Sequence, residues 1–275
     1  MRLTPFGLTM LTLAGLILPQ GAVAQQAAVP PGRWVIDYAQ SRCSLARRVG
    51  GATSPIFLLG TILGGEGPQI VLLADGGDAL PRDVPPRVDL VLAPTNVRLN
   101  LPVVRRRLRV GDSIVLEGLE ESFIEQFGQA TAVRIESGER PLLTISVPNS
   151  SGGIAALKAC NDDLLRTWGI DPAAQLSLRS LPTRRPDSRP FIFDSDYPAD
   201  AIRAGQQGTT VMRVAVGPDG RATDCVPVES AGSPSLDLQA CRLTLERSRW
   251  SPAIDAEGRP TAASVVQRVR WNLPD

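Results

Sequence analysis

The stretch YPADAIRAGQQGTTVMRVAVGPDGRATDC, residues 197–225, combines the signals of a short helix, a strand and a tight turn. A short helix is predicted to end at Gly205, because glycine commonly follows the last turn of a helix. Residues 209–216, TTVMRVAV, alternate between the two faces expected of a half-buried strand. The sequence GPDGR, with Gly220, then predicts a tight turn. The chain returns as ATDCVPVES, which places Cys225 on a second strand.

The rest of the C-terminal sequence completes a small α+β unit. Pro227 lacks an amide hydrogen, so the second strand is expected at a sheet edge. A helix is predicted from near Ser235, and residues 262–273 predict a third strand. Two apolar stripes lie on that helix, one formed by Leu236, Ala240 and Leu243 and the other by Leu238, Cys241 and Leu245. The order strand, strand, helix, strand predicts a small sheet covered on one face by a helix.

The first residues have the pattern of a secretory signal peptide. MRLTPFGLTMLTLAGLILPQGAVAQQ has one early charge, an apolar run that Pro19 closes, and small residues before Ala24. A signal peptide is predicted at residues 1–24, with cleavage after Ala24. The alternative is an uncleaved membrane anchor, but a span needs roughly 20 apolar residues and this run is shorter. Export to the periplasm is the favoured prediction.

Export changes the interpretation of the four cysteines. In an oxidising compartment an even number of cysteines indicates disulfides, and four allow three pairings. Cys225 and Cys241 are close in sequence within one unit, which leaves Cys43 with Cys160. Four buried free thiols are the alternative.

A bond between Cys225 and Cys241 would tie the C-terminal helix to the second strand. Closing this short loop would contribute roughly 3 kcal/mol by the chain-entropy relation. The bond also predicts that the stripe of Leu238, Cys241 and Leu245 faces the sheet.

Residues 30–170 predict a separate α+β domain that is mainly antiparallel. Apolar runs bounded by glycine and proline indicate strands, and the GGEG sequence at residues 64–67 favours a turn. Helices are predicted at residues 120–128 and in a closing segment that Gly169 ends. Residues 171–192 are rich in proline, serine and arginine and predict a linker, and residues 193–275 form the C-terminal domain.

The C-terminal residues resemble the TonB C-terminal domain, over the stretch from Asp196 to Pro274. The resemblance is carried by Tyr197-Pro198, Gly208, the turn Asp219-Gly220-Arg221, Gly232-Ser233-Pro234, Leu236-Asp237 and the pair Trp250 and Pro252. Each piece is short, and their order and spacing make the resemblance specific. Nothing before residue 190 takes part.

The resemblance implies a binding function in the periplasm of Gram-negative bacteria. Domains of this family hold a short extended peptide of an outer-membrane receptor, which adds as a strand to the exposed edge of the sheet. The last strand would be that edge here. The implied partner-binding residues are Ser264, Val265, Val266, Gln267, Arg268, Val269, Arg270, Trp271 and Asn272. The alternative is that this strand is a covered edge without a ligand.

Three features differ from an energy-transducing TonB. The N-terminal apolar segment has the pattern of a removable signal, the predicted linker is only about 20 residues long, and Ile202 stands where some family members have a glutamine. We therefore expect a soluble periplasmic, non-enzymatic protein that binds an outer-membrane receptor or another envelope protein. The alternative is a membrane-anchored, divergent transducer for iron-complex uptake, associated with the inner membrane.

Composition removes other classes of function. The chain contains no histidine, which excludes Ser-His-Asp and Cys-His catalysis and histidine-ligated metal sites. Its formal net charge of +1 argues against binding to nucleic acid. We expect no metal and no cofactor. A carboxylate-based envelope hydrolase in residues 30–170 is a further alternative, which would need two acids in one pocket with raised pKa values.

Overall fold

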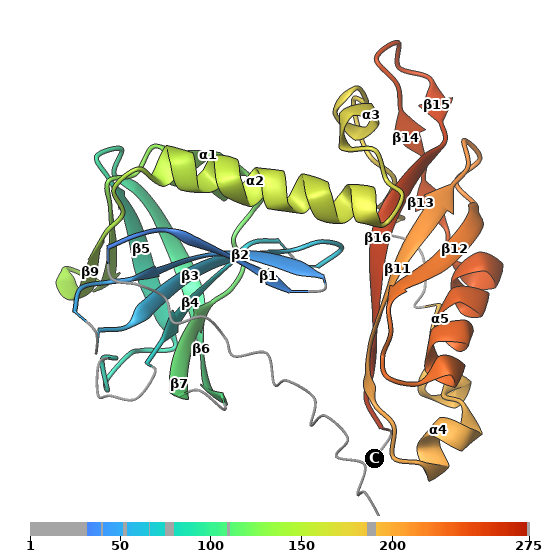
Figure 1. The fold of residues 1–275 in the computed structure, drawn as a ribbon, viewed down its shortest axis with the longest axis horizontal. Helices are drawn as coiled ribbons and strands as arrows, with labels where there is room; N and C mark the ends of the chain where they lie inside the picture. Colours follow the sequence, from blue (N-terminus) through green and yellow to red (C-terminus); the bar gives the residue numbers. More distant parts are fainter. Residues whose placement is uncertain are drawn as a thin grey trace, which may run out of the picture.

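The computed structural model describes residues 32–39, 41–51, 54–65, 67–74, 80–108, 111–185 and 191–273. The predicted signal peptide at residues 1–24 lies outside these residues. Two bodies are present, each with a hydrophobic core of its own (Figure 1). Both combine helices with antiparallel strands, so the predicted α+β class is confirmed.

The N-terminal body is one antiparallel sheet with the strand order β1-β2-β3-β4-β7-β6-β5-β8-β9. Its strands are β1 (Val35–Ala39), β2 (Arg42–Arg48), β3 (Ile56–Ile62), β4 (Gln69–Leu73), β5 (Arg87–Ala93), β6 (Val97–Leu108), β7 (Gly111–Leu116), β8 (Ala132–Ser137) and β9 (Arg140–Ser146). The long strand β6 pairs with β5 through its first half and with β7 through its second half. One strand therefore connects the two parts of the sheet.

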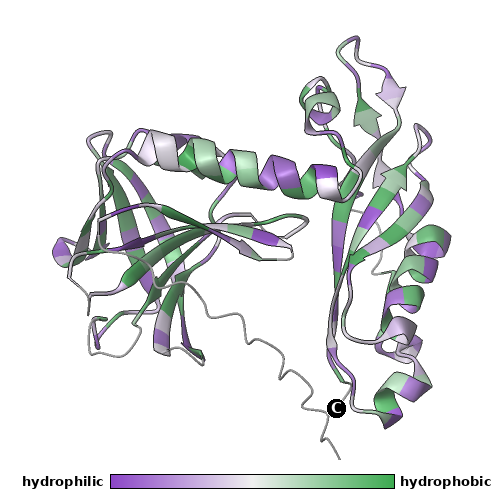
Figure 2. Ribbon diagram, in the orientation of Figure 1, coloured by the Kyte–Doolittle hydropathy of each residue, from purple (hydrophilic) through white to green (hydrophobic). Residues whose placement is uncertain are grey.

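The two outer strands of this sheet approach each other at one end. The indole Nε1 of Trp34, just before β1, donates a hydrogen bond of 2.8 Å to the carbonyl of Pro148, just after β9. Trp34 also contacts Phe57 and Phe127, whose rings stack at 5.7 Å. Hydrophobic residues recur along these strands (Figure 2), and their buried side chains form this core. The sheet is thus curled around its own hydrophobic interior.

Two helices lie across one end of the sheet, α1 (Ser122–Gly128) and α2 (Ser150–Thr167) (Figure 1). The predicted bond between Cys43 on β2 and Cys160 on α2 is confirmed, with the two Cα atoms 6.1 Å apart. Gly153 allows the close approach, because a Cβ there would stand 2.8 Å from a methyl group of Leu45. The helix ends before Gly169, which has a φ of 74° as the predicted stop requires.

The segment after α2 has structure of its own in its described residues. The helix α3 (Pro172–Leu176) begins with Asp171, whose side chain accepts a hydrogen bond from the Ala173 amide. The strand β10 (Thr183–Arg184) then pairs with β13 of the C-terminal body. The predicted linker therefore bonds to the C-terminal body, while the domain boundary at residues 171–192 stays a prediction.

The C-terminal body is a three-stranded sheet with a helix on one face. Its order is β12-β11-β16, with β11 (Gly208–Val216) in the centre between β12 (Ala222–Glu229) and β16 (Ala263–Trp271). The remaining elements are η1 (Asp194–Asp196), α4 (Ala199–Arg203), α5 (Pro234–Arg247), β13 (Trp250–Ser251), β14 (Ala253–Ile254) and β15 (Pro260–Thr261). This is the predicted order of strand, strand, helix, strand.

The second predicted disulfide, Cys225 to Cys241, is also confirmed, with a Cα–Cα distance of 5.5 Å. The predicted orientation of the helix is wrong. Leu236, Ala240 and Leu243 are fully buried against the sheet, whereas Leu238 is 71% exposed and Leu245 is 41% exposed. Cys241 lies at the border of the buried stripe, so it reaches Cys225 without turning its own stripe inward. A disulfide fixes the position of one residue of a helix, and it does not determine which apolar stripe packs against the sheet.

None of the helices among the described residues is both long and apolar enough to cross a membrane.

Candidate functional site

Strand β16 forms an edge of the C-terminal sheet and pairs on one side only, with β11. The register runs without interruption from Gly208 opposite Trp271 to Val216 opposite Ala263. Side chains alternate along the strand, as the pleat requires. Val265, Val269 and Trp271 are buried in the core beside α5, while Arg270 is exposed on the other face.

Three contacts show which backbone groups of β16 point away from β11. The Ser264 carbonyl accepts a hydrogen bond of 2.8 Å from Nε2 of Gln175, and the Arg268 carbonyl accepts one of 2.8 Å from Nε2 of Gln267. A Cβ on Gly64 would stand 2.6 Å from the Val266 carbonyl oxygen. In an antiparallel strand the N–H and C=O of one residue point the same way, and the direction alternates. The outward groups are therefore those of Ser264, Val266, Arg268 and Arg270.

The first half of this edge is covered by other parts of the chain. Gln175 on α3 occupies the Ser264 carbonyl, and the turn between β3 and β4 stands against Val266. Gly64 has a φ of 70°, and any larger residue there would collide with the Val266 backbone. A visiting strand cannot pair with Ser264 or Val266 while these contacts persist.

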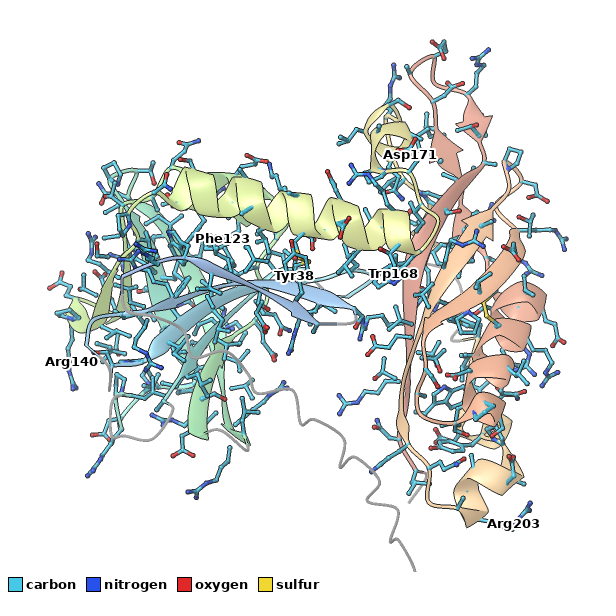
Figure 3. All side chains as sticks on the ribbon, viewed as in Figure 1. Tyr38, Phe123, Arg140, Trp168, Asp171 and Arg203 are labelled. Carbon is cyan, nitrogen blue, oxygen red and sulfur yellow. A yellow bond between two sulfur atoms is a disulfide. The ribbon has the colours of Figure 1, made fainter. Side chains whose placement is uncertain are left out.

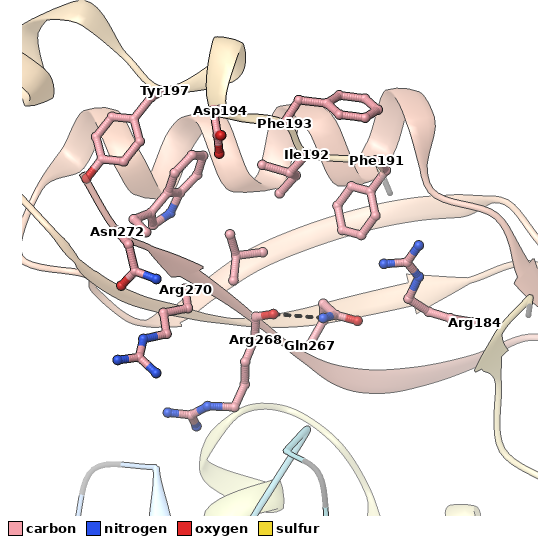
Figure 4. Close-up of a pocket in the computed structure, with 12 residues that line it drawn as sticks. Arg184, Phe191, Ile192, Phe193, Asp194, Tyr197, Gln267, Arg268, Arg270 and Asn272 are labelled. Carbon is pink, nitrogen blue, oxygen red and sulfur yellow. Dashed lines mark hydrogen bonds between the residues drawn. The ribbon is translucent and has the colours of Figure 1, made fainter. Parts of the chain in front are cut away.

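The second half of the edge borders a trough of about 300 Å³ (Figure 4). Gln267 and the residues that follow it to Asn272 form one wall, and the segment from Phe191 to Asp194 forms the other. Figure 4 shows Arg268, Arg270 and Asn272 on one side of the strand and the segment from Phe191 to Tyr197 on the opposite side. Phe193 is 50% exposed there. The trough therefore combines backbone groups that point away from β11 with an accessible aromatic ring.

Asp196 holds the far wall of the trough against α5. Its carboxylate accepts a hydrogen bond of 3.0 Å from the Phe193 amide and one of 2.8 Å from the Arg247 guanidinium. The Gln239 side chain donates to its backbone carbonyl. Burial alone would raise the pKa of Asp196, but the hydrogen bonds from Arg247 and Phe193 lower it overall. The wall is thus fixed by a group that is ionised near neutral pH.

Aromatic and polar contacts hold the C-terminal end of β16 in place. The ring of Tyr197 meets that of Trp271 edge-on at 5.3 Å, and burial raises the pKa of the Tyr197 hydroxyl. The Trp271 indole donates to the hydroxyl of Thr210, which in turn donates to Asp237. Asp237 also accepts from the amide of Ala231 at 2.9 Å. This network connects β16 to α5, and each polar group in it has a hydrogen-bond partner.

The glycines of the family pattern maintain the scaffold and do not line the trough. A Cβ on Gly208 would stand 2.3 Å from the Ala231 carbonyl oxygen. Gly220 has a φ of 77° in the hairpin turn, and its carbonyl accepts a hydrogen bond of 3.0 Å from the Trp250 amide. Ile202, at the position of the family's glutamine, is 43% exposed on α4. Gly208 and Gly220 therefore position the sheet and do not line the trough.

Arg268 faces a cavity of about 460 Å³ between the two bodies, together with Arg42 and Glu229. Burial lowers the pKa of its guanidinium, the charge of Glu229 opposes this shift, and Arg42 adds to it. Two buried atoms here, Nη1 of Arg268 and Oε2 of Glu229, have no hydrogen-bond partner. The guanidinium is therefore under-satisfied at its position beside the open edge.

The nine residues predicted to bind a partner thus fall into three sets. Those with outward backbone groups are Ser264, Val266, Arg268 and Arg270, and those packed toward the core are Val265, Val269 and Trp271, with Gln267 and Asn272 at the trough. The sequence did not indicate that Gln175 and Gly64 would cover part of the edge, because both contacts join segments far apart in the chain. It also did not indicate the wall from Phe191 to Asp194, half of which fell in the predicted linker.

Other chemistry is limited among the described residues. They contain no group of three or more cysteine, aspartate or glutamate side chains placed to hold a metal ion. Five carboxyl groups have pKa values below the ordinary range, because hydrogen bonds and nearby positive charges outweigh the effect of burial. They are Asp89, Glu136, Asp196, Asp200 and Asp255.

Comparison with known proteins gives one result. Neither the search of curated proteins nor that of solved structures returned a match. Residues 194–273 match the family described as Gram-negative bacterial TonB protein C-terminal. The matched stretch begins at η1 and ends just after β16. No family covers the N-terminal body. The edge strand and the hairpin described above therefore belong to a TonB C-terminal domain at residues 194–273, and the trough lies between this domain and the residues just before it.

Proposed function

We propose that this protein works in the periplasm as a non-enzymatic TonB-like protein that binds an extended peptide along β16. The peptide would belong to an outer-membrane receptor or another envelope protein, and the role would be linked to transport across the outer membrane. The observation that carries the proposal is that Arg268 and Arg270 direct their backbone groups away from β11 into a trough. Each of these residues offers one N–H donor and one C=O acceptor to a visiting strand.

The cell envelope fits the two disulfides, which form in oxidising compartments. A TonB C-terminal domain is itself a binding module without catalytic residues. We further propose that residues 1–24 are removed on export, so that the mature protein is not held in the inner membrane. A mature N-terminus at Gln25 in the periplasmic fraction would support this part, and retention in the inner membrane would contradict it.

The docking test uses the full mature chain and a displayed library of random dodecapeptides as the probe. Peptides enriched on the protein are labelled, and their dissociation constants are measured by fluorescence anisotropy. Arg270→Pro removes one outward N–H without removing a bond to β11, and an edge strand accepts proline at such a position. Arg270→Gln removes the same guanidinium and keeps the amide. We expect binding to Arg270→Pro to be about 10-fold weaker than binding to Arg270→Gln, as the loss of one main-chain hydrogen bond implies.

Hydrogen exchange provides a second measurement that does not depend on a variant. Addition of an enriched peptide should slow the exchange of the Arg268 and Arg270 amides and leave the amides of β12 unchanged. Equal binding to the proline and glutamine variants, together with unprotected Arg268 and Arg270 amides, would overturn the proposal. The absence of any enriched peptide would overturn it as well.

A further inference from the structure

We propose that the N-terminal domain supplies one wall of the docking cleft. The cleft would take an extended peptide that carries two acidic residues with one residue of any kind between them. This inference rests on the proposed function and adds the chemistry of the partner and a role for the N-terminal domain.

A second cavity, of about 900 Å³, opens beside the same half of β16. Its C-terminal side includes Gln267, Arg268 and Arg270, and its N-terminal side includes Gln69 at the start of β4 and Glu117 just after β7. This cavity lies on the opposite side of the strand from the trough, because Arg268 and Arg270 point away from the segment from Phe191 to Tyr197 (Figure 4). A peptide on the β16 edge would therefore have the trough on one face and the N-terminal domain on the other.

The two bodies are held in this arrangement by several contacts. Besides Gln175 and Gly64, the amide of Arg179 bonds to the Ile254 carbonyl at 2.8 Å. Trp168 at the end of α2 lies beside the C-terminal body (Figure 3) and lines a groove with Val226. The N-terminal wall is thus positioned by the fold and does not depend on a loose tether.

Charge determines what the cleft can hold. On the N-terminal wall Arg106 pairs with Glu117 at 2.9 Å, so these two charges balance each other. The other charged side chains among the described lining residues are Arg268 and Arg270. Nη1 of Arg268 is buried without a hydrogen-bond partner, and Arg270 is exposed. Glu229, which lines the neighbouring cavity, partly balances the charge of Arg268. No carboxylate of the described lining of this cleft pairs with Arg268 or Arg270. A carboxylate of a ligand would satisfy a guanidinium better than a neutral group.

The pleat fixes the spacing of the partner's side chains. Arg268 and Arg270 lie two residues apart on the same face of β16. On a paired strand, the residues opposite them are also two apart and point to the same side. The expected partner sequence is therefore acidic, any residue, acidic, with both acids toward the N-terminal wall. The turn at Gly64 stops the peptide from extending beyond Val266.

The test compares two synthetic decapeptides derived from one enriched library sequence, with Glu-x-Glu or Gln-x-Gln at the central positions. Gln69→Glu places a carboxylate on the N-terminal wall and leaves the C-terminal domain untouched. Gln126→Glu on α1 makes the same chemical change on the N-terminal domain away from the cavities described above. We expect Gln69→Glu to weaken binding of the Glu-x-Glu peptide about 3- to 5-fold, and Gln126→Glu to change it less than about 2-fold.

The wild-type protein should bind the Glu-x-Glu peptide about 5-fold more tightly than the Gln-x-Gln peptide, and Arg270→Gln should reduce this preference. Equal binding of the two peptides, or equal effects of the two glutamate variants, would overturn the inference. Arg270→Pro would still weaken both peptides in that case, and the proposed function would stand. If neither peptide binds and the library yields none, both proposals fall together.

Discussion

The two sheets of this molecule treat their edges in opposite ways. The nine-stranded sheet brings its outer strands together, and Trp34 before β1 bonds to Pro148 after β9. In the three-stranded sheet, β16 pairs with β11 on one side, and half of its other side is left open beside a trough. An unpaired strand edge promotes unwanted association unless the protein protects it. The open part of β16 is therefore available to a ligand, while Gln175 on α3 and the turn at Gly64 cover the remainder of that edge.

The disulfides give the largest expected difference between the two bodies. Cys43 and Cys160 are separated by 117 positions, and Cys225 and Cys241 by 16. Replacing Cys43 and Cys160 together by alanine should lower the free energy of unfolding of the N-terminal body by about 4 to 5 kcal/mol, since a longer closed loop restricts the unfolded chain more. The corresponding double variant of Cys225 and Cys241 should lose about 3 kcal/mol. Urea unfolding followed by hydrogen exchange in peptides of each body measures both.

A larger loss of stability for the Cys225 and Cys241 variant than for the Cys43 and Cys160 variant would contradict this expectation. We also expect each double variant to destabilise only the body that contains its disulfide. A loss of protection in β11 after replacement of Cys43 and Cys160 would mean that the two bodies unfold as one unit.

A smaller effect is expected where the outer strands of the nine-stranded sheet meet. Trp34→Phe removes the hydrogen bond to the Pro148 carbonyl and should lower the free energy of unfolding by about 1 kcal/mol. Tyr38→Phe is the control, because Tyr38 is 61% exposed on the neighbouring strand β1. Equal urea midpoints for the two variants would show that closure of the sheet does not depend on this bond.

The smallest effect concerns the wall of the trough and depends on pH. The pKa of Asp196 is lower in the folded chain than the ordinary value of about 3.9. The carboxylate therefore stabilises the fold above that value, and the stabilisation is lost as the pH falls through the folded-state pKa. Asp196→Asn should lower the free energy of unfolding by only about 0.5 to 1 kcal/mol near pH 7, since Arg247 is partly exposed. The difference from wild type should become progressively smaller as the pH falls below about 3.9.

Glu257→Gln provides the control for this measurement, because Glu257 is exposed and pairs only with Arg259 among the described residues. A difference between wild type and Asp196→Asn that does not change with pH would contradict the proposed role of the carboxylate.

Much of the C-terminal domain could be predicted from the sequence. The hairpin at Gly220, the edge position of the strand with Pro227 and the bond between Cys225 and Cys241 all depend on local chemistry. The rotation of α5 was not predicted correctly, because two apolar stripes of similar size compete and only packing shows which one is buried. Such a choice depends on the sheet beneath the helix rather than on the helix sequence.

The condition of the docking edge could not be predicted from the sequence for a different reason. A strand pattern shows that β16 can pair, but not which other segments reach its free side. Gln175 and Ser264 are 89 positions apart, and Gly64 and Val266 are still further apart. These contacts depend on how the two bodies are placed, which no local pattern encodes. Phe191 and Ile192 of the wall were missed because they directly follow a segment rich in proline, serine and arginine and were included in the predicted linker.

The anchoring of residues 179–184 has a consequence for how far the two halves of the molecule can separate. Arg179 and Ser180 bond to β14, and Thr183 pairs with β13. Only the short run from Gly169 to Gln175 spans the gap between α2 and the first contact with β16. A peptide bound to β16 would thus be held at a fixed distance from the nine-stranded sheet.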